Sequence, residues 1–270
     1  MSVAPARVRS RLRVRRAGDV LLPLGVVVLL LALLQVLAVT GAIPSDYLPP
    51  PTEIGGELVT LLGGATLWGH IGSTVTGWAM SLGIAAVLGT LVGILLGSVE
   101  SLRALTTPLV EFLRPLPSIA LIPLVILLIG GGRTGEVFLA SFAAFWQMLV
   151  AAIDSARSVD PVARETAAAF GLNGRQRIAW VYLPSMLPQL ITGVRIASAM
   201  ALVIVVTTEI LIGVPGLGQG LNLARSGGEL ARMYAYIVVI GIVGLVLNAA
   251  IRWVGDRAIS WHPSVRKGTR

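Results

Sequence analysis

The chain has 270 residues, of which 55% are hydrophobic and 13% are charged, and its formal net charge is +8. Soluble proteins carry about 25% charged residues, so this composition indicates an integral membrane protein and excludes a separate soluble domain. The absence of cysteine and the presence of only two histidines exclude disulfides, thiolate metal sites and histidine metal clusters.

The sequence also excludes nucleotide binding by a phosphate-binding loop of the GxxxxGK[ST] type. Its only lysine, Lys267, is followed by Gly268 where that loop needs serine or threonine. Any nucleotide is therefore expected to bind to another chain. We also find no HExxH motif and no constellation of a nucleophile with a base, so we expect no catalytic residue and no metal site.

Six membrane-spanning helices are predicted from segments that lack charge, because one charge at mid-bilayer costs roughly 2.5 to 3.5 kcal/mol. The second lies in an uncharged stretch longer than one span, so part of that stretch must lie at the surface. The third is expected to carry Glu111 and Arg114 in its first turns. In chain order the spans are predicted between residues 19 and 46, within 58–99, and at about 105–129, 135–153, 185–212 and 233–251.

The basic residues predict the orientation of these spans, since cytoplasmic flanks are enriched in lysine and arginine. With the N-terminus inside, most of the 21 basic residues fall on the cytoplasmic side, and an even number of spans places both termini there. We predict a basic N-terminal tail (1–19), a transmembrane domain (20–256) and a basic C-terminal tail (257–270). The N-terminal tail lacks aromatic residues and directly precedes a span, which favours contact with anionic membrane lipid over nucleic acid.

The longest interruption of the apolar sequence, residues 155–188, is predicted to form two short cytoplasmic helices. Asp160 followed by Pro161 is a favourable helix start, and Gly171 is suited to end that helix. Asn173 can cap a second helix that runs up to Pro184. From composition alone, this stretch could equally be an amphipathic loop that rests on lipid headgroups.

The same stretch resembles the EAA motif of ATP-binding-cassette (ABC) importer permeases. That motif has a glutamate, two small residues, a glycine four positions on, then nine residues, an aliphatic residue, one more residue and Leu-Pro. A threonine in place of the first alanine is the one soft departure. The matching residues are Glu165, Thr166, Ala167, Gly171, Val181, Leu183 and Pro184.

Further similar runs narrow the resemblance to permeases of the nitrate, sulfonate and taurine type. They are "LPPPTEI", "EFLRPLPSIALIPLVILLIG", "SVDP", "LPSMLPQLITGVRIA" and "TEILIGVPGLGQGL", and they extend over most of residues 47–221. Gln147 departs from the family pattern, in which proline is expected at that place.

The resemblance implies an all-helical type I importer permease with six transmembrane helices and a cytoplasmic coupling helix in the region 158–184. Such a chain is a permease subunit of the bacterial inner membrane that imports a small anionic solute. It binds no cofactor itself, since ATP and Mg belong to partner ATPase subunits. The other implied partners are an extracytoplasmic substrate-binding protein and a second permease copy, as a homodimer. Residues implied in coupling are Arg164, Glu165, Thr166, Ala167, Gly171, Leu183 and Pro184.

A secondary transporter driven by an ion gradient is the alternative, although that class favours inverted repeats, and none is found. Arg195 and Glu209 lie 14 residues apart in one predicted span, on one helix face about 21 Å apart. Arg195 could line the path, extend its long side chain to the inner membrane interface, or pair locally. The candidate pathway or gate residues are Gln147, Arg195, Thr208, Glu209, Gly216 and Gly218. The glycines at 89, 93 and 97 form a face that permits close packing of a second helix.

Overall fold

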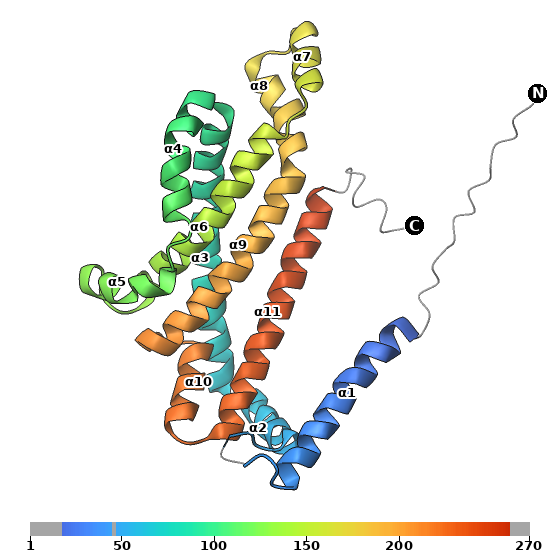
Figure 1. The fold of residues 1–270 in the computed structure, drawn as a ribbon, viewed down its shortest axis with the longest axis vertical. Helices are drawn as coiled ribbons and strands as arrows, with labels where there is room; N and C mark the ends of the chain where they lie inside the picture. The colour runs from blue at the N-terminus through green and yellow to red at the C-terminus, as the bar shows by residue number, and fades with distance from the viewer. Residues whose placement is uncertain (1–17, 45–46, 260–270) are drawn as a thin grey trace, which may run out of the picture.

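The computed structural model describes residues 18–44 and 47–259, and all regular elements within them are helical (Figure 1). The molecule is a long bundle, with α7 and α8 at one end and α2 and α10 at the other. The elements in chain order are α1 (Gly18–Val39), α2 (Pro51–Gly63), α3 (Ala65–Ser98), α4 (Glu100–Leu113), the 3-10 helix η1 (Ser118–Leu121), α5 (Ile122–Leu128), α6 (Arg133–Arg157), α7 (Pro161–Ala169), α8 (Gly174–Arg177), the π-helix η2 (Ile178–Tyr182), α9 (Leu183–Ile212), α10 (Leu217–Ser226) and α11 (Leu230–Ala258).

Helices α3, α6 and α9 form the core of the bundle, which buries small and aliphatic side chains of all three. Helices α3 and α6 approach closely where Gly89 and Gly93 of α3 face Met148 and Leu149 of α6. A Cβ on Gly89 would lie 2.7 Å from the Cβ of Met148, and one on Gly93 would lie 2.6 Å from the carbonyl oxygen of Leu149. The predicted close packing along this glycine face is therefore confirmed.

The third predicted span, 105–129, is wrong as a continuous helix. Helix α4 and the pair η1–α5 are bent by 78° at the break between them. Pro115 and Pro117 lie in this break, and because proline lacks an N–H and disfavours helix at the preceding residue, the two together interrupt the helix. Glu111 consequently lies near the end of α4, and Arg114 is its C-cap residue.

Within the described residues, four helices are long and apolar enough to cross a membrane, and the bent pair is a fifth if it forms one span. The four are Ala65–Ser98, Arg133–Arg157, Gly174–Ile212 and Leu230–Ala258. The apolar part of α1, Gly25–Val39, is shorter than these helices. α1 contacts the bundle through α2 and otherwise points away from it (Figure 1), so most of its large apolar side chains are exposed.

Helices α8, η2 and α9 form one long helical segment from Gly174 to Ile212. The prediction that the second short helix ends at Pro184 is therefore wrong. Pro184 lies at the start of α9, directly after the π-helical turn of η2. Irregular hydrogen bonding at such a turn accommodates a residue that has no N–H. The second short helix is thus continuous with the fifth predicted span.

Candidate functional site

Helix α7 begins as its sequence predicts. The Asp160 carboxylate caps it by accepting a hydrogen bond from the backbone N–H of Val162 at 2.9 Å. Pro161 occupies the first turn, where the missing N–H has no intrahelical partner to lose. The entry of the chain into this helix is therefore fixed by two adjacent residues.

The turn between α7 and α8 is also defined by local hydrogen bonds. Gly171 has a φ of +68°, in the left-handed region that glycine adopts without strain, and its N–H donates to the carbonyl oxygen of Ala168 at 3.0 Å. Asn173 and Gln176 then form a reciprocal capping box at the start of α8. The predicted arrangement of helix, glycine and capped second helix is confirmed. Hydrogen bonds fix the start of α7, the turn at Gly171 and the start of α8.

The segment 158–184 presents most of its side chains to its surroundings. The apolar side chains of Phe170 and Trp180 are 80% and 71% exposed. Exposed large apolar groups outside a hydrophobic interior indicate a surface that another molecule covers. Of the residues implied in coupling, Arg164, Glu165, Thr166, Gly171 and Leu183 are exposed, Pro184 is half-buried and Ala167 is buried.

A buried polar cluster lies at the opposite end of the bundle. We define it as the buried side chains of Thr74 (α3), Glu136 (α6) and Glu209 (α9), together with the partly exposed Ser73 (α3) and Arg133 (α6) that border them. The side chains of both glutamates have no solvent exposure. Buried carboxylates are rare in apolar helical bundles unless hydrogen bonds or ion pairs compensate for their lost hydration.

Glu209 connects α9 to both α3 and α10. Its Oε1 accepts a hydrogen bond from the Thr74 hydroxyl at 2.7 Å, and its Oε2 accepts one from the backbone N–H of Gly218 at 2.8 Å. The Thr74 oxygen accepts in turn from the N–H of Leu217 at 2.9 Å. The two side chains thus satisfy N–H groups at the start of α10, where the N-cap residue Gly216 offers no side-chain acceptor.

Arg133 connects the start of α6 to α3 and to the loop before α10. Its Nη1 donates to Oε1 of Glu136 at 2.6 Å, and its Nη2 donates to the carbonyl oxygen of Pro215 at 3.2 Å. The same Nη2 also contacts the Ser73 hydroxyl. Among the residues that the structure describes, the second oxygen of Glu136 has no hydrogen-bond partner. One guanidinium therefore holds three segments together in this cluster.

The structure brings three of the six candidate pathway or gate residues together at this cluster. Gly216 and Gly218 lie against Glu209, and a Cβ on Gly218 would be 2.8 Å from the Cβ of Glu209. Thr208 is buried beside them, but its hydroxyl donates to carbonyl oxygens of its own helix, Ile204 at 2.9 Å among them. Among the described residues, the Thr208 hydroxyl therefore makes no hydrogen bond to another element.

Gln147 and Arg195 lie elsewhere. Gln147 is partly buried on α6. Arg195 of α9 pairs with Asp256 of α11, with 3.5 Å between Nη2 and Oδ1, which is the local pairing that the sequence left open. In the described part of the chain its buried Nε has no hydrogen-bond partner.

Sequence reasoning missed Arg133, Glu136, Ser73 and Thr74. The available signal was the i,i+3 spacing of Arg133 and Glu136, which suits an ion pair on a helix. No other charged residue lies between Arg114 and Asp154, so this pair is isolated in apolar sequence. An isolated charged pair at the start of a predicted span is a candidate for burial.

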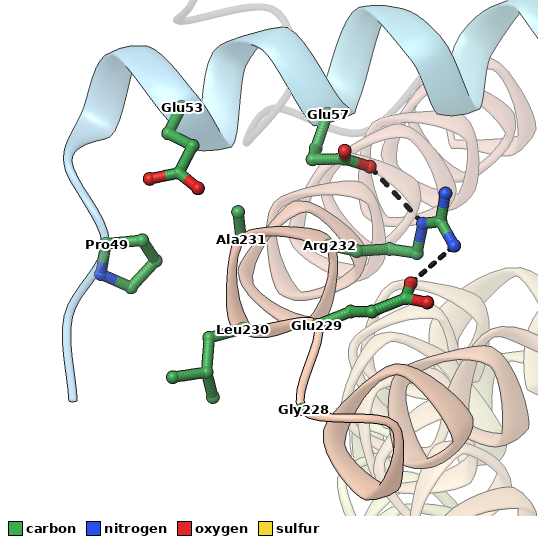
Figure 2. A pocket seen from close by; sticks show the side chains of 8 residues that line it. All are labelled: Pro49, Glu53, Glu57, Gly228, Glu229, Leu230, Ala231 and Arg232. Atoms are coloured by element: carbon green, nitrogen blue, oxygen red, sulfur yellow. Dashed lines mark hydrogen bonds and ion pairs between the residues drawn. The ribbon is translucent and has the colours of Figure 1, made fainter. Parts of the chain in front are cut away.

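A pocket of about 440 Å³ lies at the end of the bundle that carries α2, between α2 and the start of α11 (Figure 2). Arg232 stands between two carboxylates, with its Nε 3.3 Å from Oε2 of Glu57 and its Nη1 in contact with Glu229. Figure 2 shows the Glu53 carboxylate directed toward the space between Pro49 and α11. The titratable residues that line this pocket are mainly acidic, in contrast to the net charge of the whole chain.

The chain is similar in sequence to a family of transport proteins. The model of the family described as "Binding-protein-dependent transport system inner membrane component" matches residues 86–260. The taurine transport system permease protein TauC of Escherichia coli K12 is 30% identical over 256 residues, which cover 92% of each chain. The putative aliphatic sulfonates transport permease protein SsuC of Bacillus subtilis 168 is 26% identical over 87% of this chain and 85% of its own length.

Among solved structures, a chain of the MetNI methionine ABC transporter in inward-facing conformations superposes with a TM-score of 0.61. The superposition covers 72% of this chain and 95% of that chain at 20% identity. At this identity the likeness establishes the shared fold.

Proposed function

This chain belongs to the family of binding-protein-dependent transport system inner membrane components, and we propose that it forms the path by which a small anionic solute crosses the membrane. As a member of the family it is the permease subunit of an ABC importer in the bacterial inner membrane, which is a transport subunit and not an enzyme. Its partners are ATPase subunits and a substrate-binding protein. ATP and Mg²⁺ are then bound by the ATPase.

The observation that carries the proposal is the form of the segment 158–184. It projects from the end of the bundle (Figure 1), it is stiffened by caps on both short helices, and its second helix continues directly into α9. A force applied to α7 would therefore move α9 without an intervening flexible linker. These features support the role of the segment as the coupling helix, with Arg164 and Glu165 as exposed polar contacts for the ATPase.

The role of the segment 158–184 as the coupling helix also implies how the chain is oriented in the membrane. The segment 158–184 faces the cytoplasm, where ATP is available, so the opposite end faces outward. The outward end then holds the buried polar cluster and the acidic pocket of Figure 2, and the substrate-binding protein docks on that side. Both termini lie in the cytoplasm in this topology, although the tails 1–17 and 260–270 are outside the described residues.

The solute class is proposed from the two relatives, whose names refer to taurine and to aliphatic sulfonates. A sulfonate group is an anion, and Arg195 is a cationic residue within a span. The exposed apolar faces of α1 and α9 leave room for a second copy of this chain, and we propose a homodimer with the path between the copies. Gln147, Thr208, Glu209, Gly216 and Gly218 remain the further candidates for lining or gating that path.

The proposal is tested by reconstitution into vesicles with the ATPase and the binding protein from the same gene cluster. We expect uptake of taurine or an alkyl sulfonate that requires ATP. Glu165→Ala removes a charged contact to the ATPase and is expected to reduce ATP-driven uptake roughly tenfold or more. Glu111→Ala, which removes an exposed carboxylate from α4, is the control and should transport as the unmodified protein does.

Solute uptake at the same rate by vesicles that lack the ATPase would contradict the proposal and favour the ion-driven transporter. An equal loss of uptake in both variants would contradict the coupling role of Glu165 while leaving the permease assignment intact.

A further inference from the structure

A cavity of about 350 Å³ lies beside the segment 158–184, where the ends of the core helices meet it. Five elements contribute to its wall, which are α3, α4, α6, α7 and η2. This volume is within the range of small-molecule sites in proteins, which is about 300 to 1,000 Å³. The lining residues are Gly97, Ser98, Glu100, Arg103, Ala156, Arg157, Arg164 and Tyr182.

The wall of this cavity carries more positive than negative charges. Arg103 is paired with Glu100, which is the one carboxylate among the described residues of the lining. Within the described residues, no carboxylate lies at ion-pair distance from Arg157 or Arg164. Guanidinium groups gathered around one cavity repel each other, and an anion between them relieves this repulsion.

We propose that this cavity binds a phosphate-type anion, supplied either by a phospholipid headgroup or by inorganic phosphate. Guanidinium groups present paired N–H donors that match phosphate oxygens, and the hydroxyls of Ser98 and Tyr182 offer further donors in the same wall. An anion here joins Arg164 of α7 to Arg157 at the end of α6. It therefore holds the segment 158–184 against the core of the bundle.

This site is independent of the transported solute. Binding of a lipid headgroup rests on the proposed topology, because a headgroup reaches the cavity only if this end of the bundle lies at the cytoplasmic membrane surface. Binding of inorganic phosphate requires only the cavity and its arginines. The two sources are distinguished by the choice of probe.

The experiment uses the full-length chain in its assembled complex with the ATPase, without nucleotide and at low ionic strength. Inorganic phosphate is titrated in detergent, and the melting temperature of the complex is followed. In parallel, the complex is reconstituted into vesicles of phosphatidylglycerol with phosphatidylcholine or of phosphatidylcholine alone, and retained lipid is quantified after purification.

The variants are Arg157→Gln and the double variant Arg157→Gln/Arg164→Gln. Arg175→Gln is the control, since Arg175 is exposed on α8 and does not line the cavity.

We expect the apparent affinity for the anion to fall about tenfold for each arginine removed, because each removal takes away charge-assisted hydrogen bonds to the anion. Arg175→Gln should bind as the unmodified complex does. Stabilisation by inorganic phosphate assigns the free anion, and retention of phosphatidylglycerol without a phosphate effect assigns the headgroup. If the double variant fails to assemble, Arg157→Gln alone, outside the coupling segment, decides the result. An unmodified complex that responds to neither probe, or a control that loses as much as the cavity variants, would overturn the proposal.

Discussion

Thr208 and Glu209 are neighbours on α9 and are both buried, yet Thr208 makes its hydrogen bonds within α9 whereas Glu209 makes them to other elements. Within the part of the chain that the structure describes, the Thr208 hydroxyl donates only to carbonyl oxygens of its own helix. The Glu209 carboxylate accepts hydrogen bonds from the Thr74 hydroxyl of α3 and from the N–H of Gly218 at the start of α10. Loss of Glu209 therefore leaves buried donors of two other elements without an acceptor.

From this difference we predict that Glu209→Ala lowers the free energy of unfolding by about 2 to 4 kcal/mol, since each orphaned buried donor costs about 1 to 3 kcal/mol. Thr208→Val, which preserves the shape of the side chain, should cost less than about 1 kcal/mol because no other element loses a partner. Denaturant titration of the purified chain in detergent, followed by circular dichroism, measures both. Equal effects of the two substitutions would contradict the connecting role of Glu209.

At the scale of single residues, the sequence could indicate Glu209, Gly216 and Gly218, because a charge followed by clustered glycines is conspicuous in an apolar chain. It could not indicate Thr74, since an uncharged threonine in a span differs little from the other threonines of the chain. Its role arises only because α3 places its hydroxyl between Glu209 and the N–H of Leu217. Such contacts join residues more than 130 positions apart, so no local sequence pattern can predict them.

At the scale of elements, the contact between α3 and α6 depends on the absence of side chains at a few α3 positions. Gly93 faces the backbone of α6 directly, whereas no other described segment lies within 4 Å of the Cβ position of Gly83 in the same helix. The two glycines therefore form a matched pair, one inside the contact and one outside it.

Gly93→Ala is predicted to destabilise the chain by about 1 to 3 kcal/mol, because the added methyl group overpacks the contact. Gly83→Ala should be neutral or stabilising by up to about 1 kcal/mol, because alanine favours a helix over glycine. The difference in melting temperature of the two variants in detergent measures this contrast. The account of the contact is wrong if Gly93→Ala is as stable as Gly83→Ala.

The elements that the sequence predicted well are those whose ends are set by neighbouring residues. Asp160, Pro161, Gly171 and Asn173 define the two short helices through contacts with residues close in the chain, and all four act as expected. The bend between α4 and α5 was missed, although Pro115 and Pro117 lie in it. An apolar run of span length favoured one helix, and proline alone does not specify whether a helix kinks or breaks.

At the scale of the whole molecule, the resemblance of the coupling segment and its neighbouring runs predicted the family and the all-helical importer fold, and both are confirmed. The orientation in the membrane stays a prediction, because it rests on the distribution of basic residues and on the role of the coupling segment. The absence of cysteine makes it directly testable, since a single introduced cysteine is the only thiol in the chain.

We predict that Ser226→Cys, at the end of α10, is labelled by a membrane-impermeant maleimide added outside intact cells. Ala168→Cys, exposed on α7, should be labelled only after the membrane is opened. Mass analysis of the purified chain quantifies the label at each position. The reverse pattern would invert the topology and with it the assignment of the acidic pocket to the outer face.

The most direct measurement of the central claim is crosslinking from the same two positions in the assembled, ATP-hydrolysing complex, with a reagent that joins the thiol to a nearby amine. If α7 is the element held by the ATPase, Ala168→Cys forms a covalent adduct with the ATPase subunit, and Ser226→Cys forms none. The claim is contradicted if a complex that hydrolyses ATP gives no adduct from Ala168→Cys, or gives as much from Ser226→Cys.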